Sequence, residues 1–477
     1  MKRKKVKYEV LSGRFRELYH ERVWGLDSTP QFTSNLLNKK DFTSGISDAK
    51  FSIVRRNDTS FEGSWNITHV LVEVEQDLEL KGDRVSGNKD MNVSFHPSHM
   101  KRFRNMCDGL FDFEAIQPTE GRERCISHLN LGWVSCYVGA VSVDREKIMG
   151  STGGEAIESV SGRDEKDESL LFLKGAIKSE KPLPAMVTRK MNEAMRKALS
   201  SVVVSPEVGQ DPEPVSRLEG PTFIVKRGDY ANPCMSIASI YNVFVAMKKF
   251  NVTSPNIVWL DGHATGSLDG VWADLFQAKV VHVKQLPSGV FIEEAFVVNQ
   301  LSAFGDEGIK IHRWGEACHN SSSLHQFRDF VLEKYQVKRS VTETKLVTFL
   351  IGQNYKAHPR SDGITDRAIA NVEADRAYVE SLYPGYHIDV VSFEEMPFQD
   401  QLAQIVKTDI LVAVHGAGNI HSIFLPDNAK FVEFFPPKFK SRKRFRFLAE
   451  SIGVHYTAML ARVVSSRNGK VQVTIQP

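Results

Sequence analysis

Short apolar stretches alternate with segments of helical periodicity throughout the second half of the chain. Strands covered on both faces read as continuous apolar runs, so this alternation predicts parallel sheets with helices on both sides. The first series of expected elements comprises strands 222–226, 256–261 and 280–283 and helices 234–250 and 268–276. The second series comprises strands 346–351, 387–393, 409–414 and 430–435 and helices 366–382, 399–407 and 418–424. Two such series predict an α/β protein with two Rossmann-like halves facing a cleft, where ligands of open parallel sheets bind.

The chain before these two series has a different pattern. Residues 1–45 are polar with a basic tip, and we expect a poorly ordered arm there. Alternating apolar positions between about 50 and 145 predict strands, whereas the charged segment 159–182 predicts a linker and the prolines of 205–221 predict a loop. The expected domains are the arm, an N-terminal lobe over 46–335 with a Rossmann-like core at about 221–335, and a C-terminal lobe over 336–477.

Composition narrows the class of protein. With 42% hydrophobic and 25% charged residues the 477-residue chain is typical of a globular protein, and its net charge of +3 does not suggest a nucleic-acid binder. The chain has no apolar run of about 18 residues that would predict a membrane span. Its basic start is not followed by the apolar stretch of a signal peptide. Taken alone, these features argue for a cytosolic protein.

Sequons and cysteines argue for the secretory lumen instead. Asn-x-Ser/Thr sequons, which are glycosylated only there, occur at Asn57, Asn66, Asn92, Asn251 and Asn320. Cys107, Cys125 and Cys136 lie within thirty residues of one another without the spacing of metal ligands. They allow a disulfide, Cys107–Cys125 or Cys125–Cys136, or they are reduced thiols. The sequence leaves these alternatives and the compartment open.

The strongest local signal is the loop His415-Gly416-Ala417-Gly418-Asn419, which follows an apolar strand and opens a helix. Glycines let the backbone approach a ligand closely, and the first N–H groups of a helix attract phosphate. His415 is placed to hydrogen-bond a phosphate or a sugar hydroxyl. Glu433, on the next strand, is placed to accept hydrogen bonds from both hydroxyls of a ribose. The loop and the carboxylate together predict a nucleotide site.

Two other interpretations of this loop are a turn without a ligand and the oxyanion loop of an esterase. A tight strand-to-helix turn without a ligand explains the loop but not the carboxylate on the adjacent strand. The oxyanion loop of an esterase requires a G-x-S-x-G nucleophile elbow, which the chain lacks. A P-loop and a G-x-G-x-x-G turn after a strand are also missing.

Several motifs together resemble glycosyltransferase family 61, in particular the β-1,2-xylosyltransferases that modify the core mannose of N-linked glycans. The matching pieces are 144–148, 153–163, 229–232, 258–263, 355–360, 415–418, 431–435 and 455–459. They follow the same order as in the family, and the resemblance covers roughly residues 105–470.

The resemblance implies an inverting enzyme with a GT-B-like fold and an N-terminal extension. The N-terminal lobe would take the acceptor, and the C-terminal lobe would hold a UDP-sugar as co-substrate, with no other cofactor required. The residues that match the family's donor site are His415, Gly416, Ala417, Gly418, Asn419, Glu433 and Arg360. No metal is expected, because the chain contains no D-x-D motif.

The resemblance also implies the partners and the compartment. The expected sugar is xylose, with N-acetylglucosamine as the alternative, and the expected acceptor is a glycan or glycoprotein. No nucleic-acid partner is expected, and a membrane is expected only through an anchor that this chain does not show. Relatives are anchored by an N-terminal span in the Golgi or endoplasmic reticulum, so the lumen of one of these is the expected location.

One departure from the family concerns the leaving diphosphate. Where relatives have two arginines shortly before the motif at 355–360, this chain has Ile351-Gly352. Arginine pairs are strong diphosphate ligands. The basic run between Lys438 and Arg446 either replaces them or is a solvated face.

A second departure concerns the catalytic base. Relatives have a His and an Asp where this chain has Met235 and Ser239, and neither of these is a base near neutral pH. The candidates that remain are Asp229, Asp261, Glu293 and Glu294, each of which could instead be a surface or turn residue. The sequence therefore predicts an inverting glycosyltransferase. The alternative is a catalytically impaired relative that binds a nucleotide sugar or a glycan.

Overall fold

The computed structural model describes most of the chain from residue 133 onward and separate strands before it. The described residues are 4–11, 14–19, 42–46, 51–55, 61–65, 69–74, 91–92, 113–116, 125–128, 133–183, 193–206, 208, 216–299, 322–338, 344–352, 358–363, 366–440, 442, 444–467 and 470–476.

The chain divides into two compact units, residues 1–110 with 309–323 and residues 111–308 with 324–477. In the first unit, the described strands form two antiparallel sheets with the orders β2-β1-β6-β3 and β5-β4-β7. These strands are β1 (Lys4–Leu11), β2 (Arg14–Tyr19), β3 (Phe42–Ile46), β4 (Phe51–Arg55), β5 (Phe61–Trp65), β6 (His69–Val74) and β7 (Met91–Asn92). Two of them, β1 and β2, lie within the segment expected as an arm.

The first large sheet of the second unit, here called the N-sheet, has the order β14-β13-β10-β18-β15-β16-β17, and β9 and β8 extend it beside β10. Its strands are β8 (Phe113–Ile116), β9 (Cys125–His128), β10 (Trp133–Val143), β13 (Ile177–Ser179), β14 (Val203–Val204), β15 (Arg217–Val225), β16 (Asn256–Trp259), β17 (Val280–His282) and β18 (Val290–Val298). Strands β15, β16 and β17 run parallel, as the pattern predicts, and helices α5 (Pro233–Phe250) and α6 (Asp269–Phe276) connect them in turn. Strand β18, which the pattern did not predict, runs parallel beside β15.

The second large sheet, here called the C-sheet, is entirely parallel and has the order β21-β19-β22-β23-β24. Its strands are β19 (Leu346–Leu350), β21 (His387–Val391), β22 (Ile410–Val414), β23 (Lys430–Phe435) and β24 (His455–Leu460). The helices beside it are α8 (Val372–Leu382), α9 (Phe398–Val406), the 3-10 helix η6 (Ala417–Phe424) and α10 (Arg444–Ser451). A small sheet of β20 (Ala368–Ile369), β26 (Lys470–Thr474) and β25 (Arg462–Arg467) follows. The predicted α/β class is confirmed.

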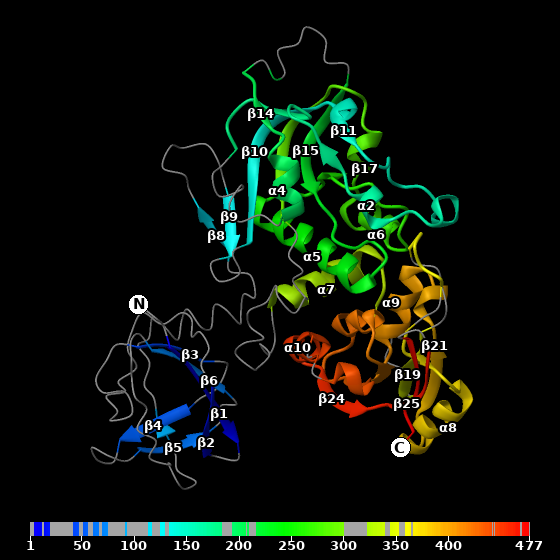
Figure 1. Cartoon of the computed structure of the whole chain (residues 1–477). Helices are drawn as coiled ribbons and strands as arrows, with labels where there is room; N and C mark the ends of the chain where they lie inside the picture. The colour runs from blue at the N-terminus through cyan, green and yellow to red at the C-terminus, as the bar shows by residue number, and fades with distance from the viewer. Residues whose placement is uncertain are drawn as a thin grey trace. The chain divides into compact units, whose positions relative to one another are not determined.

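Helices α5 and α7 (Ser322–Lys334) lie between the N-sheet and the C-sheet (Figure 1). Aromatic side chains fill this junction: the Phe327 ring contacts Tyr241 of α5 at 5.1 Å and Phe424 of η6 at 6.4 Å between centroids. Asn232 begins α5 by accepting hydrogen bonds from the N–H groups of Cys234 and Met235. This cap fixes the start of α5 directly after β15, at the carboxyl edge of the N-sheet.

The segment predicted as a linker, 159–182, is ordered structure, and that prediction was wrong. It holds η2 (Ile157–Val160), α2 (Glu165–Glu168), β12 (Leu171–Phe172) and β13. Residues 150–168, here called the strap, bind the carboxyl edge of the N-sheet through main-chain hydrogen bonds. These are Gly154 N–H to His263 O (2.8 Å), Thr265 N–H to Glu155 O (2.8 Å) and Gly262 N–H to Glu168 O (3.0 Å). The charged side chains of this segment suggested a linker, but the backbone hydrogen bonds that hold it in place cannot be recognised from side-chain composition.

The remaining described elements are short: η1 (Arg145–Lys147), β11 (Ile148–Met149), α4 (Glu193–Leu199), η3 (Val283–Gln285), η5 (Phe393–Glu395) and η7 (Pro437–Phe439). The expected loop 205–221 ends earlier than predicted, because β15 begins at Arg217.

A disulfide between Cys125 and Cys136 joins β9 to β10, which selects one of the alternatives left open by the sequence. Cys234 is buried in α5, and Cys107 and Cys318 lie outside the described residues. The sequons Asn57, Asn66 and Asn320 also lie outside them, the side chain of Asn92 is not described, and Asn251 is exposed at the end of α5.

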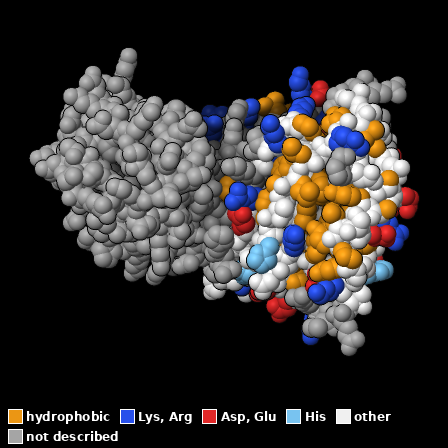
Figure 2. Space-filling view, turned by 90° about the horizontal axis from the view of Figure 1, so that it is seen from below, with side chains coloured by type: hydrophobic (Ala, Val, Ile, Leu, Met, Phe, Trp, Pro, Cys, Tyr) orange, Lys and Arg blue, Asp and Glu red, His pale blue; other side chains and the backbone are white. Residues whose placement is uncertain are grey.

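Within the described residues, no helix is long and apolar enough to cross a membrane. Hydrophobic side chains do gather on one face, flanked by lysines and arginines (Figure 2). Exposed large hydrophobic residues include Met459 and Leu460 of β24 and Val463 and Val464 of β25.

Candidate functional site

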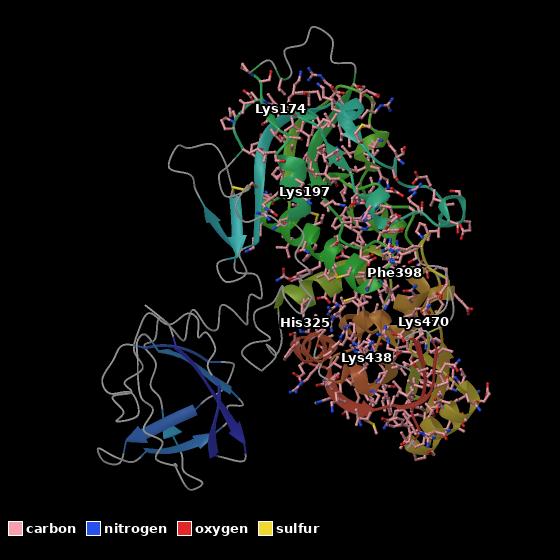
Figure 3. All side chains as sticks on the ribbon, in the orientation of Figure 1. Lys174, Lys197, His325, Phe398, Lys438 and Lys470 are labelled. Carbon is pink, nitrogen blue, oxygen red and sulfur yellow. A yellow bond between two sulfur atoms is a disulfide. The ribbon has the colours of Figure 1, made fainter. Side chains whose placement is uncertain are left out.

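A pocket of about 360 Å³ lies at the carboxyl ends of β19 and β22. In the C-sheet β19 has β21 on one side and β22 on the other, so the chain changes direction across the sheet at this point. Such a switch point leaves a crevice between the connections on either side, where ligands of open α/β sheets bind. The lining residues are Pro233, Ser267, Leu350, Ile351, Gly352, Ser361, Asp366, Arg367, Ile369, Phe393, Glu394, Met396, Pro397, Phe398, Gln401, Val414, His415, Gly416, Ala417, Gly418, Asn419 and His421. Figure 3 labels Phe398, which belongs to α9.

The predicted loop His415–Asn419 forms one wall of this pocket. Neither of its glycines is required by the fold. Gly416 has an extended backbone (φ −166°), and neither it nor Gly418 has a positive φ. A Cβ added at Gly416 would meet only Val414 O at 3.6 Å, and one at Gly418 only Leu350 Cδ2 at 3.5 Å, both ordinary contacts. The missing side chains therefore leave space on the pocket side of the loop.

Glu433 organises the loop from behind. Its side chain is fully buried in β23, and its Oε1 accepts hydrogen bonds from His415 Nδ1 (2.6 Å) and Asn419 Nδ2 (3.0 Å). Its Oε2 accepts one from the hydroxyl of Tyr456 (2.6 Å), whose pKa is raised by burial and by this carboxylate. Because protein donors engage both oxygens, Glu433 fixes the orientation of His415 and Asn419. The His415 ring is further stacked on Phe435 at 4.9 Å.

Arg367 is a lining residue that sequence reasoning missed. It precedes β20 and has a left-handed backbone (φ 72°), which is costly for a residue with a side chain and is often found at functional sites. Its guanidinium lies 4.7 Å from the Phe439 ring, and Arg442 lies 5.0 Å from the same ring. Its Nε is buried and makes no hydrogen bond within the described residues. Burial lowers the pKa of Arg367, partly opposed by Asp366, so an anion in the pocket would stabilise its charge.

The basic run named from the sequence has other contacts. Lys438 lies 5.8 Å from the Phe439 ring, Arg444 contacts Cys234 Sγ at 3.6 Å, and Arg446 pairs with Glu450 at 2.8 Å. Arg367 is the only lysine or arginine among the described residues that line the pocket.

Arg360, predicted to bind the donor, is not among the lining residues. Its Nη1 lies 3.6 Å from Oε2 of the fully buried Glu168, at the end of the strap. Asp229 is close by: its Oδ1 lies 3.5 Å from His358 Nε2 and accepts hydrogen bonds from the N–H groups of Ala231 and Asn232. These groups form a cluster at the carboxyl edge of the N-sheet, beside the pocket.

Asp261 has the opposite setting to Asp229. It is fully buried and receives hydrogen bonds from Arg227 through Nη2 (2.8 Å) and Nε (3.2 Å). Burial alone would raise the pKa of Asp261, but the charge of Arg227 outweighs it and holds that pKa well below its usual range. Arg227 also pairs with Asp269 at 2.6 Å and lies 3.7 Å from the Trp259 ring. The arrangement is a closed ionic network.

The last two candidates, Glu293 and Glu294, are exposed in the middle of β18. Their strand pairs with β10 and β15, where Glu294 lies opposite Pro221. Neither belongs to the pocket lining. The two positions that depart from relatives also differ in setting, since Ser239 is buried in α5 while Met235 is only partly buried near its start. No group of three or more potential metal ligands was found among the described residues.

Comparisons with known proteins bear on this geometry. The glycosyltransferase 61 family model matches residues 228–432, which include both the pocket loop and the N-sheet edge. The chain is 26% identical to beta-1,2-xylosyltransferase RCN11 of Oryza sativa subsp. japonica over 375 residues, covering 70% of this chain and 69% of the relative. It is 23% identical to a beta-1,2-xylosyltransferase of Arabidopsis thaliana over 384 residues, covering 66% of this chain and 71% of the relative.

A further relative is a transferase of a different sugar. The chain is 30% identical over 142 residues to an EGF domain-specific O-linked N-acetylglucosamine transferase of Drosophila melanogaster, covering 30% of this chain and 25% of the relative. All of these relatives are glycosyltransferases. With the α/β sheets and the motifs around the pocket, these matches identify the chain as a glycosyltransferase that is similar to members of glycosyltransferase family 61.

Proposed function

We propose that this chain is an inverting GT-B-type enzyme that transfers a sugar from a UDP-sugar to a glycan or glycoprotein. The pocket at the switch point of the C-sheet carries the proposal, because a glycine-bearing loop and a half-buried arginine meet there. Its volume of about 360 Å³ lies within the range of about 300–1,000 Å³ typical of small-molecule sites. In this proposal the N-terminal lobe, 46–335, takes the acceptor and the C-terminal lobe, 336–477, holds the donor.

The diphosphate lies between the loop and Arg367 in this proposal. The first N–H groups of η6 have no partners within that helix and point their dipole toward an anion. Arg367 adds a positive charge in place of the arginine pair that Ile351-Gly352 replaces. These groups would neutralise a leaving diphosphate, so the proposed reaction needs no metal and no cofactor besides the UDP-sugar.

His415 and Asn419 would contact the donor directly, and Glu433 would act through them. The sequence prediction gave Glu433 to the ribose, but its hydrogen bonds to His415, Asn419 and Tyr456 support a positioning role. With Nδ1–H donating to Glu433, the Nε2 of a neutral His415 carries a lone pair, which can accept a hydrogen bond from a ribose hydroxyl.

Of the four carboxylates named as candidate bases, Asp229 alone is both partly exposed and part of the cluster beside the pocket. It borders the pocket side of the N-sheet and is partly exposed, whereas Asp261 is closed into the Arg227 network. Glu293 and Glu294 lie on an exposed part of β18 away from the lining residues. Arg360 is reassigned from the donor to the cluster around Glu168.

The relatives support xylose as the sugar, with N-acetylglucosamine as the alternative. The proposed location is the lumen of the Golgi or endoplasmic reticulum. The sequons and the Cys125–Cys136 disulfide support it, because an oxidising compartment preserves such a bond.

The proposal is tested by incubating the full chain with UDP-xylose or UDP-N-acetylglucosamine and with N-glycan or EGF-domain acceptors. Transfer with inversion, read by mass spectrometry and NMR, is the expected result. Titration calorimetry with UDP runs in parallel as a measure of donor binding. Absence of both transfer and donor hydrolysis would contradict an active transferase.

The second candidate is a family member that binds a nucleotide sugar without turning it over. Met235 and Ser239 favour it, because neither side chain supplies the base that relatives have at those positions. Micromolar UDP binding without transfer or hydrolysis would support this candidate. No binding at millimolar UDP would contradict both.

A further inference from the structure

The cluster beside the pocket contains a histidine held by a buried carboxylate. Glu168 ends α2 of the strap and is fully buried, and its Oε2 lies 3.2 Å from His263 Nδ1. Its Oε1 accepts a hydrogen bond from the hydroxyl of Tyr230 at 2.9 Å. Arg360, whose Nη1 lies 3.6 Å from Glu168 Oε2, is a further charged neighbour of this carboxylate. Strap, N-sheet edge and pocket rim thus meet at one carboxylate.

Glu168 is held in its charged form. Burial would raise its pKa, but hydrogen bonds from His263 and Tyr230 and the charge of Arg360 lower it below the usual value. A carboxylate can only accept hydrogen bonds, so the Nδ1 of His263 carries the proton. The other ring nitrogen, Nε2, then has a lone pair available.

That second nitrogen has no partner among the described residues. His263 is 7% exposed, and its Nε2 is buried without a hydrogen bond, as is Nδ1 of His358. Both rings contact Tyr230: His263 stacks on it at 4.6 Å, and His358 meets it edge-on at 5.2 Å between centroids. Buried polar atoms in native proteins nearly always have partners, so two unpartnered nitrogens around one tyrosine indicate a place where a polar ligand binds.

The cluster borders the donor pocket. Ser361 lines the pocket, and its N–H donates to His358 O at 2.9 Å. Ser267, another lining residue, follows His263 by four residues along the chain. A hydroxyl bound at the cluster would therefore lie next to a sugar bound in the pocket.

We propose that His263, oriented by Glu168, is the general base that accepts the proton of the acceptor hydroxyl. This inference rests on the proposed function, since it requires a UDP-sugar in the pocket. The acceptor O–H bond breaks, its proton goes to Nε2 of His263, and the oxygen bonds to C1 of the sugar. The bond between C1 and the β-phosphate oxygen breaks, and its electron pair leaves with UDP. The imidazolium that forms is stabilised by Glu168, a positioning residue.

The test compares His263→Ala with His282→Gln. His282 is a matched control because it is a buried histidine at the end of the next strand, with Nδ1 bonded to Asp261 O at 2.9 Å, and it does not line the pocket. Each variant is assayed for transfer, for donor hydrolysis in which water replaces the acceptor, for UDP binding and for melting temperature. A general base contributes about 10²- to 10⁴-fold, so His263→Ala should lose that much of both reactions and keep its UDP affinity. The control should stay within about threefold in both reactions.

A pH profile separates a base from a merely structural histidine. The charged or titratable groups around His263 are Glu168, Tyr230, Asp261, His358, Arg360 and Arg227. Glu168→Gln removes the charge that stabilises the imidazolium, so the acid limb of the rate profile should move to lower pH. The limb should disappear in His263→Ala, and added imidazole should restore part of the rate.

The outcomes distinguish this inference from the proposed function. A folded, UDP-binding His263→Ala variant that transfers at the rate of the unaltered chain overturns the assignment of the base alone. An unaltered chain that binds UDP but neither transfers nor hydrolyses the donor also overturns it. Absence of UDP binding by the unaltered chain contradicts the proposed function itself.

Discussion

The N-sheet and the C-sheet both contain parallel strands whose carboxyl ends lie at one edge. The charged side chains at these two edges are arranged differently. At the N-sheet edge, Arg227, Asp261 and Asp269 satisfy one another in a buried network. At the C-sheet edge, Arg367 borders an open pocket and its Nε has no partner within the described residues. Charged groups that pair with one another in a buried network stabilise the fold, whereas a buried arginine nitrogen without a hydrogen bond beside a cavity indicates a ligand.

Glycines at the two edges differ in the same way. A Cβ added at Gly262 would lie 2.6 Å from Ser151 O of the strap, so close packing requires glycine there. A Cβ added at Gly418 would make only an ordinary contact at 3.5 Å with Leu350. The fold explains the first glycine, and a closely approaching ligand is the better explanation of the second.

The largest effect is expected from opening the ionic network. Asp261→Ala leaves the charge of Arg227 buried with only Asp269 beside it, and should lower the free energy of unfolding by about 3–5 kcal/mol. Urea unfolding measures the loss. The control is Asp427→Ala, which removes an exposed partner of Arg328 and should cost less than about 1 kcal/mol. Equal costs for the two variants would show that the network is not a framework.

The next largest effect is expected from removing the Arg367 side chain at the carboxyl edge of the C-sheet. Arg367→Gly keeps the left-handed backbone at no steric cost, so a loss of binding would report on the side chain. Losing charge-assisted hydrogen bonds worth about 1.5–3 kcal/mol should weaken UDP binding by about 10- to 150-fold. Calorimetry with UDP, and with uridine as the ligand without phosphate, measures it. Arg376→Ala, which breaks an exposed pair with Glu380 on α8, should leave both affinities unchanged. Unchanged UDP affinity in Arg367→Gly would remove Arg367 from the site.

The stability of the fold should also depend on pH through a buried histidine beside the C-sheet. Burial lowers the pKa of His421, a pocket-lining residue, from 6.5 to about 4. Between these values the unfolded chain binds more protons, so stability is fully present above pH 6.5 and falls progressively toward pH 4. From pH 7 to pH 5 the loss due to this group is about 2 kcal/mol. His421→Gln should reduce the pH dependence of urea unfolding by that amount, and an unaltered dependence would show that His421 does not cause it.

The smallest effect sharpens the comparison of glycines. Gly418→Ala should change the free energy of unfolding by less than about 0.5 kcal/mol but weaken UDP binding by about tenfold. Gly262→Ala should show the reverse pattern, with a loss of about 1–3 kcal/mol in stability and an unchanged UDP affinity. Calorimetry and urea unfolding on the same two variants check both. Loss of stability in Gly418→Ala would mean that the loop glycine is structural after all.

Sequence patterns predicted the two parallel series because strands such as β19 and β22 are apolar along almost their whole length. They also located the pocket loop, since a histidine and glycines directly after a strand have few structural explanations. They missed Arg367, because nothing in the sequence around it shows a left-handed backbone facing a cavity. They missed Glu168 for a related reason: it lies in a charged segment whose order depends on backbone contacts with residues about a hundred positions away. They did not show the hydrogen bond from Tyr456 to Glu433, because the tyrosine lies on the next strand, 23 residues later.

The strap should determine which part of the protein opens first on heating. It is held by main-chain hydrogen bonds, among them Gly162 N–H to Pro359 O at 2.8 Å, and by side-chain contacts such as Gln285 Nε2 to Gly153 O at 2.8 Å, and most of its residues are exposed. Segments with little apolar burial open at a lower free-energy cost than the core around them. Opening the strap withdraws Glu168 from His263 while both sheets stay folded. With His263 as the proposed base, we expect turnover to fall in a temperature range in which the protein remains compact, and amide exchange in residues 150–168 should mark where that loss begins.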